Sequence, residues 1–185
     1  MTTARHLSLA ELEAGLPEMR RSPGDSGTLV RIVVRPDKEL RELPHSCDLT
    51  PEAGIPADRW ARYCTHQLPD GRLNPETQLT LMNARANALI AGDDERGSLS
   101  GDNLIVDLDL SASNLPAGQR LKIGEAIDEI TAKPHTGCAK FSSRFGAEAL
   151  RFVNSPEGTA LRLRGAHAQV VQAGRISVGD RIEKL

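Results

Sequence analysis

The chain has 185 residues, a net charge of −2 at pH 7 and an apolar fraction of 39%, which together are typical of a single folded domain. Its aromatic residues are one Trp, one Tyr and three Phe, too few for the stacking platforms that bind nucleic acid. The N-terminus lacks the apolar run of a secretory signal, and no stretch approaches the length of a membrane span. We therefore expect a cytoplasmic protein with neither a nucleic-acid nor a membrane partner.

The N-terminal part predicts a helix followed by a strand. Residues 8–16 have a short helical pattern, with Ser8 as the N-cap and Glu11 as its capping-box partner. A β-branched run over residues 28–35 predicts a strand that ends before Pro36.

The middle of the chain predicts long loops and one helix. Residues 37–73 contain four prolines and few periodic apolar residues, so we expect connecting loops there. Trp60 is expected to be a core residue beneath these loops, and His45 and His66 are expected to be exposed loop histidines. Residues 83–91 form a helical pattern that ends at a glycine.

The C-terminal half predicts short strands broken by glycines. One helical segment, from Cys138 to Val153 and split at Gly146, interrupts them. We therefore predict a mainly β fold with short helices: a small closed or nearly closed antiparallel β-barrel with a helical insertion, in one domain over residues 1–185. The predicted strands are 103–108, 119–123, 126–131, 160–163, 166–172, 175–178 and 181–184.

One thiol lies among a histidine and two cations. Cys138 follows His135 and Gly137 and precedes Lys140 and Arg144. Neighbouring cations and a helix N-terminus lower a thiol pKa and make the sulfur a nucleophile or a metal ligand. The alternative is a small buried side chain with charged neighbours.

The other two cysteines, Cys47 and Cys64, bring the total to three and form no Cys-x-x-Cys pair. Neither a disulfide framework nor a four-ligand zinc site is therefore indicated, and we expect reduced thiols.

Charge is unevenly distributed around Cys138. Residues 133–175 include seven Lys or Arg and two Glu. These charges can simply be solvated, but their clustering near Cys138 favours an anionic ligand such as a phosphorylated small molecule.

Several of these stretches resemble the MOSC domain, the C-terminal module of molybdenum cofactor sulfurases, which also occurs alone in bacteria. The resemblance is strongest from about residue 97 to the C-terminus and becomes weaker upstream. Residues 1–27 are expected to form an N-terminal extension of a helix and a loop. The resemblance rests on the stretches Gly101–Val106, Leu115–Gly124, His135–Gly146 and Arg164–Asp180.

The chain departs from the family at two places. The family segment that usually reads Gly-Asp-Arg-Trp has Ala57 instead of the glycine before Asp58. Many relatives that hold the cofactor have an arginine two residues before Asn103, where this chain has Gly101.

The resemblance implies a domain that binds the molybdenum cofactor (molybdopterin, a phosphorylated pterin) and carries sulfur. Cys138 would hold a persulfide or bind molybdenum, because a soft thiolate suits a thiophilic metal. His135, Lys140 and Arg144 would pair with the phosphate. Asn103 would hydrogen-bond the pterin edge, or else would cap a turn.

Two alternatives stay open. One is a stand-alone molybdenum enzyme that reduces N-hydroxylated compounds, which would need a separate reductase because the chain has no iron–sulfur or flavin motif. The other is a non-catalytic interaction domain. Any sulfur would come from a partner cysteine desulfurase, since pyridoxal phosphate is expected only in that partner.

Overall fold

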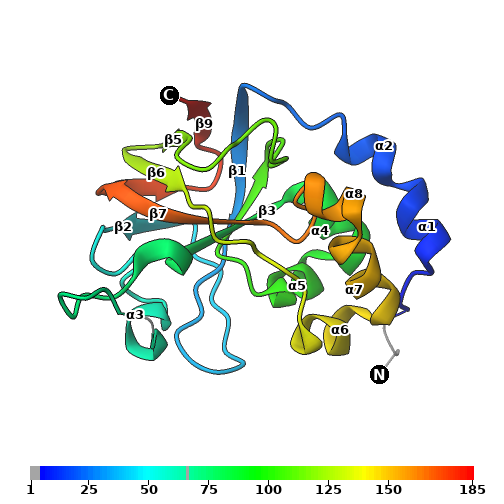
Figure 1. Cartoon of the computed structure of the whole chain (residues 1–185), viewed down its shortest axis with the longest axis horizontal. Coiled ribbons are helices and arrows are strands. Elements are labelled where there is room, and N and C mark those ends of the chain that lie inside the picture. The colour runs from blue at the N-terminus through cyan, green and yellow to red at the C-terminus, as the bar shows by residue number, and fades with distance from the viewer. Residues whose placement is uncertain (1–4, 66) are drawn as a thin grey trace.

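A closed barrel of seven strands forms the centre of the molecule (Figure 1). The structure, a computed structural model, describes residues 5–65 and 67–185. The strands follow one another around the barrel in the order β1, β4, β3, β7, β6, β5 and β9. Their bounds are β1 Ser26–Ile32, β3 Leu79–Asn83, β4 Leu104–Asp107, β5 Arg120–Ile123, β6 Ala126–Ile130, β7 Ala166–Gln172 and β9 Arg181–Lys184. The prediction of a small closed β-barrel is confirmed.

One strand pair makes the barrel mixed rather than wholly antiparallel. β3 and β4 run parallel, with Leu81 opposite Leu104, while the other pairs of the barrel are antiparallel. A parallel pair needs a crossover connection, and α4 (Ala84–Ala91) lies in it. A further two-stranded sheet pairs β2 (Ser46–Leu49) with β8 (Gly174–Ser177).

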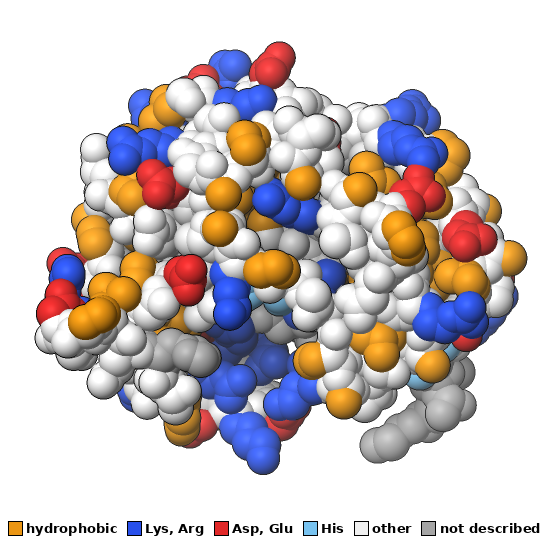
Figure 2. Space-filling view, viewed as in Figure 1, with side chains coloured by type: hydrophobic (Ala, Val, Ile, Leu, Met, Phe, Trp, Pro, Cys, Tyr) orange, Lys and Arg blue, Asp and Glu red, His pale blue; other side chains and the backbone are white. Residues whose placement is uncertain are grey.

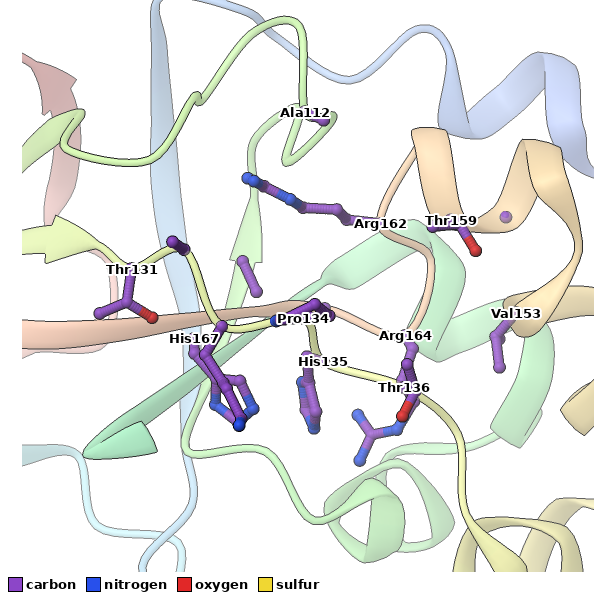
Figure 3. Close-up of a pocket in the computed structure, with 15 residues that line it drawn as sticks. Ala112, Thr131, Pro134, His135, Thr136, Val153, Thr159, Arg162, Arg164 and His167 are labelled. Carbon is purple, nitrogen blue, oxygen red and sulfur yellow. The ribbon is translucent and has the colours of Figure 1, made fainter. Parts of the chain in front are cut away.

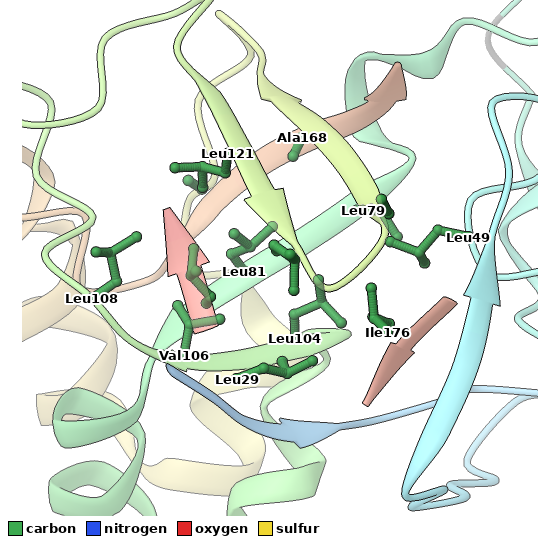
Figure 4. Packing of buried hydrophobic residues seen from close by; sticks show 14 of the residues in the cluster. Leu29, Leu49, Leu79, Leu81, Leu104, Val106, Leu108, Leu121, Ala168 and Ile176 are labelled. Carbon is green, nitrogen blue, oxygen red and sulfur yellow. The ribbon is translucent and has the colours of Figure 1, made fainter. Parts of the chain in front are cut away.

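Two hydrophobic clusters lie on opposite faces of β3 and β4. Leu81 and Leu104 belong to the cluster inside the barrel, shown in Figure 4. Their neighbours Met82 and Ile105 belong to a second cluster beneath the helices. Successive side chains of a strand point to opposite faces, so these strands are buried on both sides, and their sequences are mostly apolar.

Most of the helices gather on one side of the barrel, and α3 lies apart from them beside the long loops (Figure 1). The predicted N-terminal helix is present: the side chain of Ser8 accepts a hydrogen bond from the Glu11 amide and the capping box is complete. The helices are α1 Leu9–Ala14, α2 Leu16–Met19, α3 Trp60–Tyr63, α5 Asp94–Gly97, α6 Ala139–Phe145, α7 Ala147–Asn154 and α8 Pro156–Ala160, with 3-10 turns η1 Pro75–Thr77 and η2 Ser98–Ser100. None of the helices in the described residues has the length and apolar character to cross a membrane.

The helical insertion forms as predicted, and one predicted strand does not. Cys138 is the N-cap of α6, and Gly146, at φ 95°, separates α6 from α7. Residues 160–163 are instead the end of α8 and a turn. Ser155 caps α8 by accepting from the Gly158 amide, and Pro156 opens the helix. These start signals outweigh the apolar residues that suggested a strand.

Candidate functional site

A cationic cavity of about 550 Å³ lies between the barrel and the loops around α3. Figure 2 shows Lys and Arg side chains gathered in a hollow of this face. No Asp or Glu is among the described residues that line the cavity. Its lining side chains include Arg35, Arg59 and Arg164, the histidines His135 and His167, and Trp60, Tyr63 and Cys64.

A buried carboxylate holds Arg35 in place. Asp58 accepts hydrogen bonds from Nε of Arg35 at 2.9 Å and from Nη2 at 3.0 Å. Arg35 also donates to Oδ1 of Asn103 at 3.0 Å and to the carbonyl oxygen of Gly101 at 2.6 Å. Because four bonds fix its guanidinium, Arg35 is preorganised for an anionic ligand.

A second buried carboxylate holds Arg164. Nη1 of Arg164 donates to both oxygens of Asp102, at 3.0 and 2.7 Å. Burial of Asp102 acts to raise its pKa, but the charge of Arg164 and the hydrogen bonds from Ser100 and Arg164 outweigh burial and leave the pKa below its usual value. Asp102 is therefore an anion that neutralises Arg164 from behind the cavity wall.

Two histidines with tilted, closely packed rings adjoin this pair. The ring centroids of His135 and His167 lie 4.4 Å apart at an angle of 38°, and Figure 3 shows the His135 ring between the His167 ring and the guanidinium of Arg164. Burial lowers the pKa of His135 to about 3 against the attraction of Asp102, and burial also lowers the pKa of His167. Both imidazoles are therefore neutral at pH 7.

Three buried nitrogen atoms of this group make no well-formed hydrogen bond to any described residue: Nδ1 of His135, Nδ1 of His167 and Nε of Arg164. Buried polar atoms in folded proteins almost always have a partner. Nδ1 of His135 nevertheless lies 3.5 Å from Oδ1 of Asp102, and a backbone hydrogen bond with Leu79 acts on His167. Nε of Arg164 is thus the hydrogen-bonding group left over for a ligand.

The predicted site residues are only partly brought together. His135 lines the cavity, whereas Cys138, exposed at the start of α6, is not among the described residues that line it. Lys140 and Arg144 both pair with Glu39, Lys140 at 3.0 Å. The assignment of Cys138, Lys140 and Arg144 to a binding site stays a prediction.

Asn103 is fully buried and bonded to the barrel. Its Oδ1 accepts from the hydroxyl of Thr80 and from Arg35, and its Nδ2 donates to Asp58 and to the carbonyl oxygen of Val33. These bonds use its polar atoms to fix the position of Arg35. A hydrogen bond from Asn103 to a pterin stays a prediction.

Sequence reasoning did not single out Arg35, Arg59, Arg164 or His167 as site residues. Arg164 falls in the basic region from residue 133 to 175, but nothing local distinguishes it there. Gly101, which stands where many relatives have an arginine, lies between two of these cations: Arg35 donates to its carbonyl oxygen, and a Cβ on it would lie 3.8 Å from Nη2 of Arg164. Arginines from other segments therefore supply positive charge at this place.

The fold has several relatives of known structure. YuaD from Bacillus subtilis superposes with a TM-score of 0.62 at 18% identity, covering 86% of this chain and 95% of its own. YiiM from Geobacillus stearothermophilus gives a TM-score of 0.59 at 14% identity, covering 86% of this chain and 75% of its own. YiiM from Escherichia coli gives 0.55 at 18% identity, with 85% and 69% covered. At these identities the similarity establishes the fold.

The sequence itself carries the family assignment. No curated protein sequence matches the chain significantly. Residues 58–183, however, match the family model of the MOSC domain. This match covers more than half of the chain, including six of the seven barrel strands, with β9 complete except for its last residue, and all of the helical insertion. The chain therefore belongs to the MOSC domain family, which is associated with the molybdenum cofactor.

Proposed function

We propose that this protein binds the molybdenum cofactor in the cationic cavity and carries sulfur on Cys138. The observation that supports cofactor binding is a cavity of about 550 Å³ with three arginines and two neutral histidines and with no acid among its described lining residues. That volume lies in the range of small-molecule sites, about 300–1,000 Å³. Family membership supplies the identity of the ligand.

The residues present suit a phosphorylated pterin. Arg35, Arg59 and Arg164 would hold the phosphate, because guanidinium groups pair with phosphate oxygens through charge-assisted hydrogen bonds. His135 and His167 line the cavity, and their neutral rings would hydrogen-bond the polar edge of the pterin. Trp60 and Tyr63 line the same cavity and offer flat apolar surface to a ring. The cofactor, when bound, would supply a metal centre that accepts a sulfur ligand.

The position of Cys138 favours a sulfur carrier over a permanent metal ligand. Its side chain is exposed, and a surface thiol can meet a desulfurase that loads it with sulfur. A permanent ligand would be expected among the residues that line the cavity. The stand-alone reductase, which would work with a separate electron donor, is therefore the second candidate.

Anaerobic reconstitution with the cofactor tests binding. We expect the wild-type protein to retain pterin, measured by fluorescence after oxidation, and Arg59→Gln to retain it about tenfold less tightly, because one charge-assisted hydrogen bond contributes roughly 1.5–3 kcal/mol. Arg144→Ala tests the predicted phosphate contact in the same way. Lys122→Gln, on an exposed position of β5, is the matched control.

Cys138→Ser separates the two candidates. In a sulfur carrier this variant keeps the pterin and loses sulfur that cyanide releases, whereas in the reductase it loses molybdenum. Wild-type protein that retains neither pterin nor cyanide-releasable sulfur would contradict both, and the interaction domain would remain.

A further inference from the structure

A second, smaller cavity of about 190 Å³ lies next to the larger one (Figure 3). Residues 131–136, the C-terminal part of α8 and the turn before β7 enclose it. His135, Arg164 and His167 line both cavities, so these three side chains form the boundary between them. The small cavity is below the usual size of a cofactor site, about 300–1,000 Å³. It suits a ligand of a few heavy atoms.

The lining of the small cavity is positively charged. Lys133, Arg162 and Arg164 are among its lining residues, and no Asp or Glu is found among those that the structure describes. Thr136 and Thr159 add hydroxyl groups, and the two neutral histidines add ring nitrogens. Hydrogen-bond donors of this kind match the oxygens of an anion.

Two of the three cations have no carboxylate partner. Within residues 5–65 and 67–185, neither Lys133 nor Arg162 takes part in an ion pair. Lys140 and Arg144, on α6, are by contrast both paired with Glu39. Positive charge at the small cavity is thus left uncompensated.

Arg162 and Arg164 are held in fixed positions. Nη1 of Arg162 donates to the carbonyl oxygen of Leu115 at 2.6 Å, and its backbone is left-handed at φ 48°, a conformation uncommon for a side-chain-bearing residue. Arg164 is 6% exposed and is anchored by Asp102, yet its Nε lacks a partner. The cations are therefore in place before any ligand arrives.

We propose that the small cavity binds a small inorganic oxyanion of the size of sulfate or phosphate, held by Lys133, Arg162 and Nε of Arg164. This site goes beyond the proposed cofactor site and does not need the cofactor to be present. The boundary side chains place the oxyanion next to the larger cavity, so a bound oxyanion lies beside whatever that cavity holds.

Calorimetric titration of the cofactor-free protein with sulfate tests the proposal. We expect saturable binding that Lys133→Gln weakens several-fold and Arg162→Gln weakens about tenfold, as loss of a charge-assisted hydrogen bond implies. Lys122→Gln, on an exposed position of β5, should leave sulfate affinity unchanged, and Arg59→Gln, which changes only the larger cavity, should weaken it less than Lys133→Gln does. Lys133 is exposed and makes no ion pair in the described structure, so its variant should fold normally.

Two results would overturn the proposal. One is the absence of saturable sulfate binding at millimolar concentration. The other is a loss of affinity in Arg59→Gln as large as in Lys133→Gln, which would place the sulfate in the larger cavity. Crystals soaked in selenate give an independent reading: an anomalous peak beside Arg162 supports the site, and a peak only beside Arg59 contradicts it. Failure of cofactor reconstitution would leave these outcomes unaffected, so the two proposals fail separately.

Discussion

Single buried carboxylates decide how the cationic cavity is built. Asp58 and Asp102 lie behind the wall and fix Arg35 and Arg164 by paired hydrogen bonds. Removing one partner of a buried ion pair typically costs about 3–5 kcal/mol, because the other charge is left uncompensated. The positions of the arginines thus depend on residues that a ligand would not touch.

The three thiols should differ in reactivity. Cys138 is exposed, whereas burial and the neighbouring Asp48 raise the pKa of Cys47 to about 12. Since the thiolate is the reactive form, we expect limiting iodoacetamide to label Cys138 first, as read by peptide mass spectrometry. Cys138→Ser should remove the first labelled peptide. Earlier labelling of Cys47 or Cys64 would refute this order.

Asp128 should make the protein less stable as pH rises. Its carboxyl is fully buried inside the barrel, neither oxygen has a hydrogen-bond partner among the described residues, and burial raises its pKa to about 8. Between its unfolded pKa, near 4, and about pH 8 the folded protein therefore holds a proton that the unfolded chain releases. Folding stability from this group falls with rising pH over that window and levels off above it.

Asp128→Asn removes this titration. The variant should become more stable relative to the wild type as pH rises. The difference between their free energies of unfolding should grow by up to about 1.4 kcal/mol for each pH unit across the window. Urea unfolding at about pH 5 and about pH 8 measures it. Asp25→Asn, at an exposed position, is the control and should show no such trend. A difference that is constant with pH would show that Asp128 is ionised in the folded state.

At the scale of elements, one loop reaches across to α6. Glu39, between β1 and β2, bonds Lys140 and Arg144 of α6, and these bonds lower the pKa of Glu39 to about 2. Glu39 also has a left-handed backbone at φ 61°. The two cations predicted to hold a phosphate are thus occupied by a carboxylate of the same chain.

Glu39→Gln should free both cations for an anionic ligand. We expect the variant to retain the pterin cofactor a few-fold more tightly than the wild type, with a steeper loss of affinity as salt is added, because exposed charges are screened by salt. Glu42→Gln, in the same loop, is the matched control. Equal retention in Glu39→Gln and the wild type would mean that Lys140 and Arg144 do not contact the ligand.

At the scale of the whole molecule, the two hydrophobic clusters share the strands β3 and β4. The N-terminal helices belong to the second cluster through Leu12, Leu16 and Met19, although they precede the part that matches the family model. Because the shared strands link both clusters, we expect the chain to unfold in one cooperative transition.

Leu12→Ala tests that expectation. Leu12 is 1% exposed, so its truncation should lower the free energy of unfolding by about 2–4 kcal/mol, measured by urea unfolding with a single midpoint. Glu13→Ala, on the exposed side of the same helix, should change stability by less than about 0.5 kcal/mol. Two separate transitions, or an effect of Leu12→Ala as small as that of Glu13→Ala, would show that the extension folds apart from the barrel.

Local signals in the sequence determined much of the fold. The capping box at Ser8, the break at Gly146 and the strands at residues 166–172 and 181–184 match the structure because each depends on residues close along the chain. The predicted strand at residues 160–163 was wrong because its apolar pattern was weighed without the helix start at Ser155. The mostly apolar runs on both sides of a helix, residues 79–82 with Thr80 among them and residues 104–106, were the available sign of a parallel pair.

Only the tertiary structure decided the composition of the cavity. Arg35, Arg59 and Arg164 come from three distant segments and meet because the barrel closes. Their partners Asp58 and Asp102 are likewise identified only by their positions in space. Local propensity acts between residues within about ten positions of one another and predicts helices, strands and turns. The charge of a cavity depends instead on which distant segments the closed barrel brings together. The sequence by itself therefore determined the family, the barrel and the thiol at the start of a helix, and tertiary packing decided which cations and histidines share a cavity.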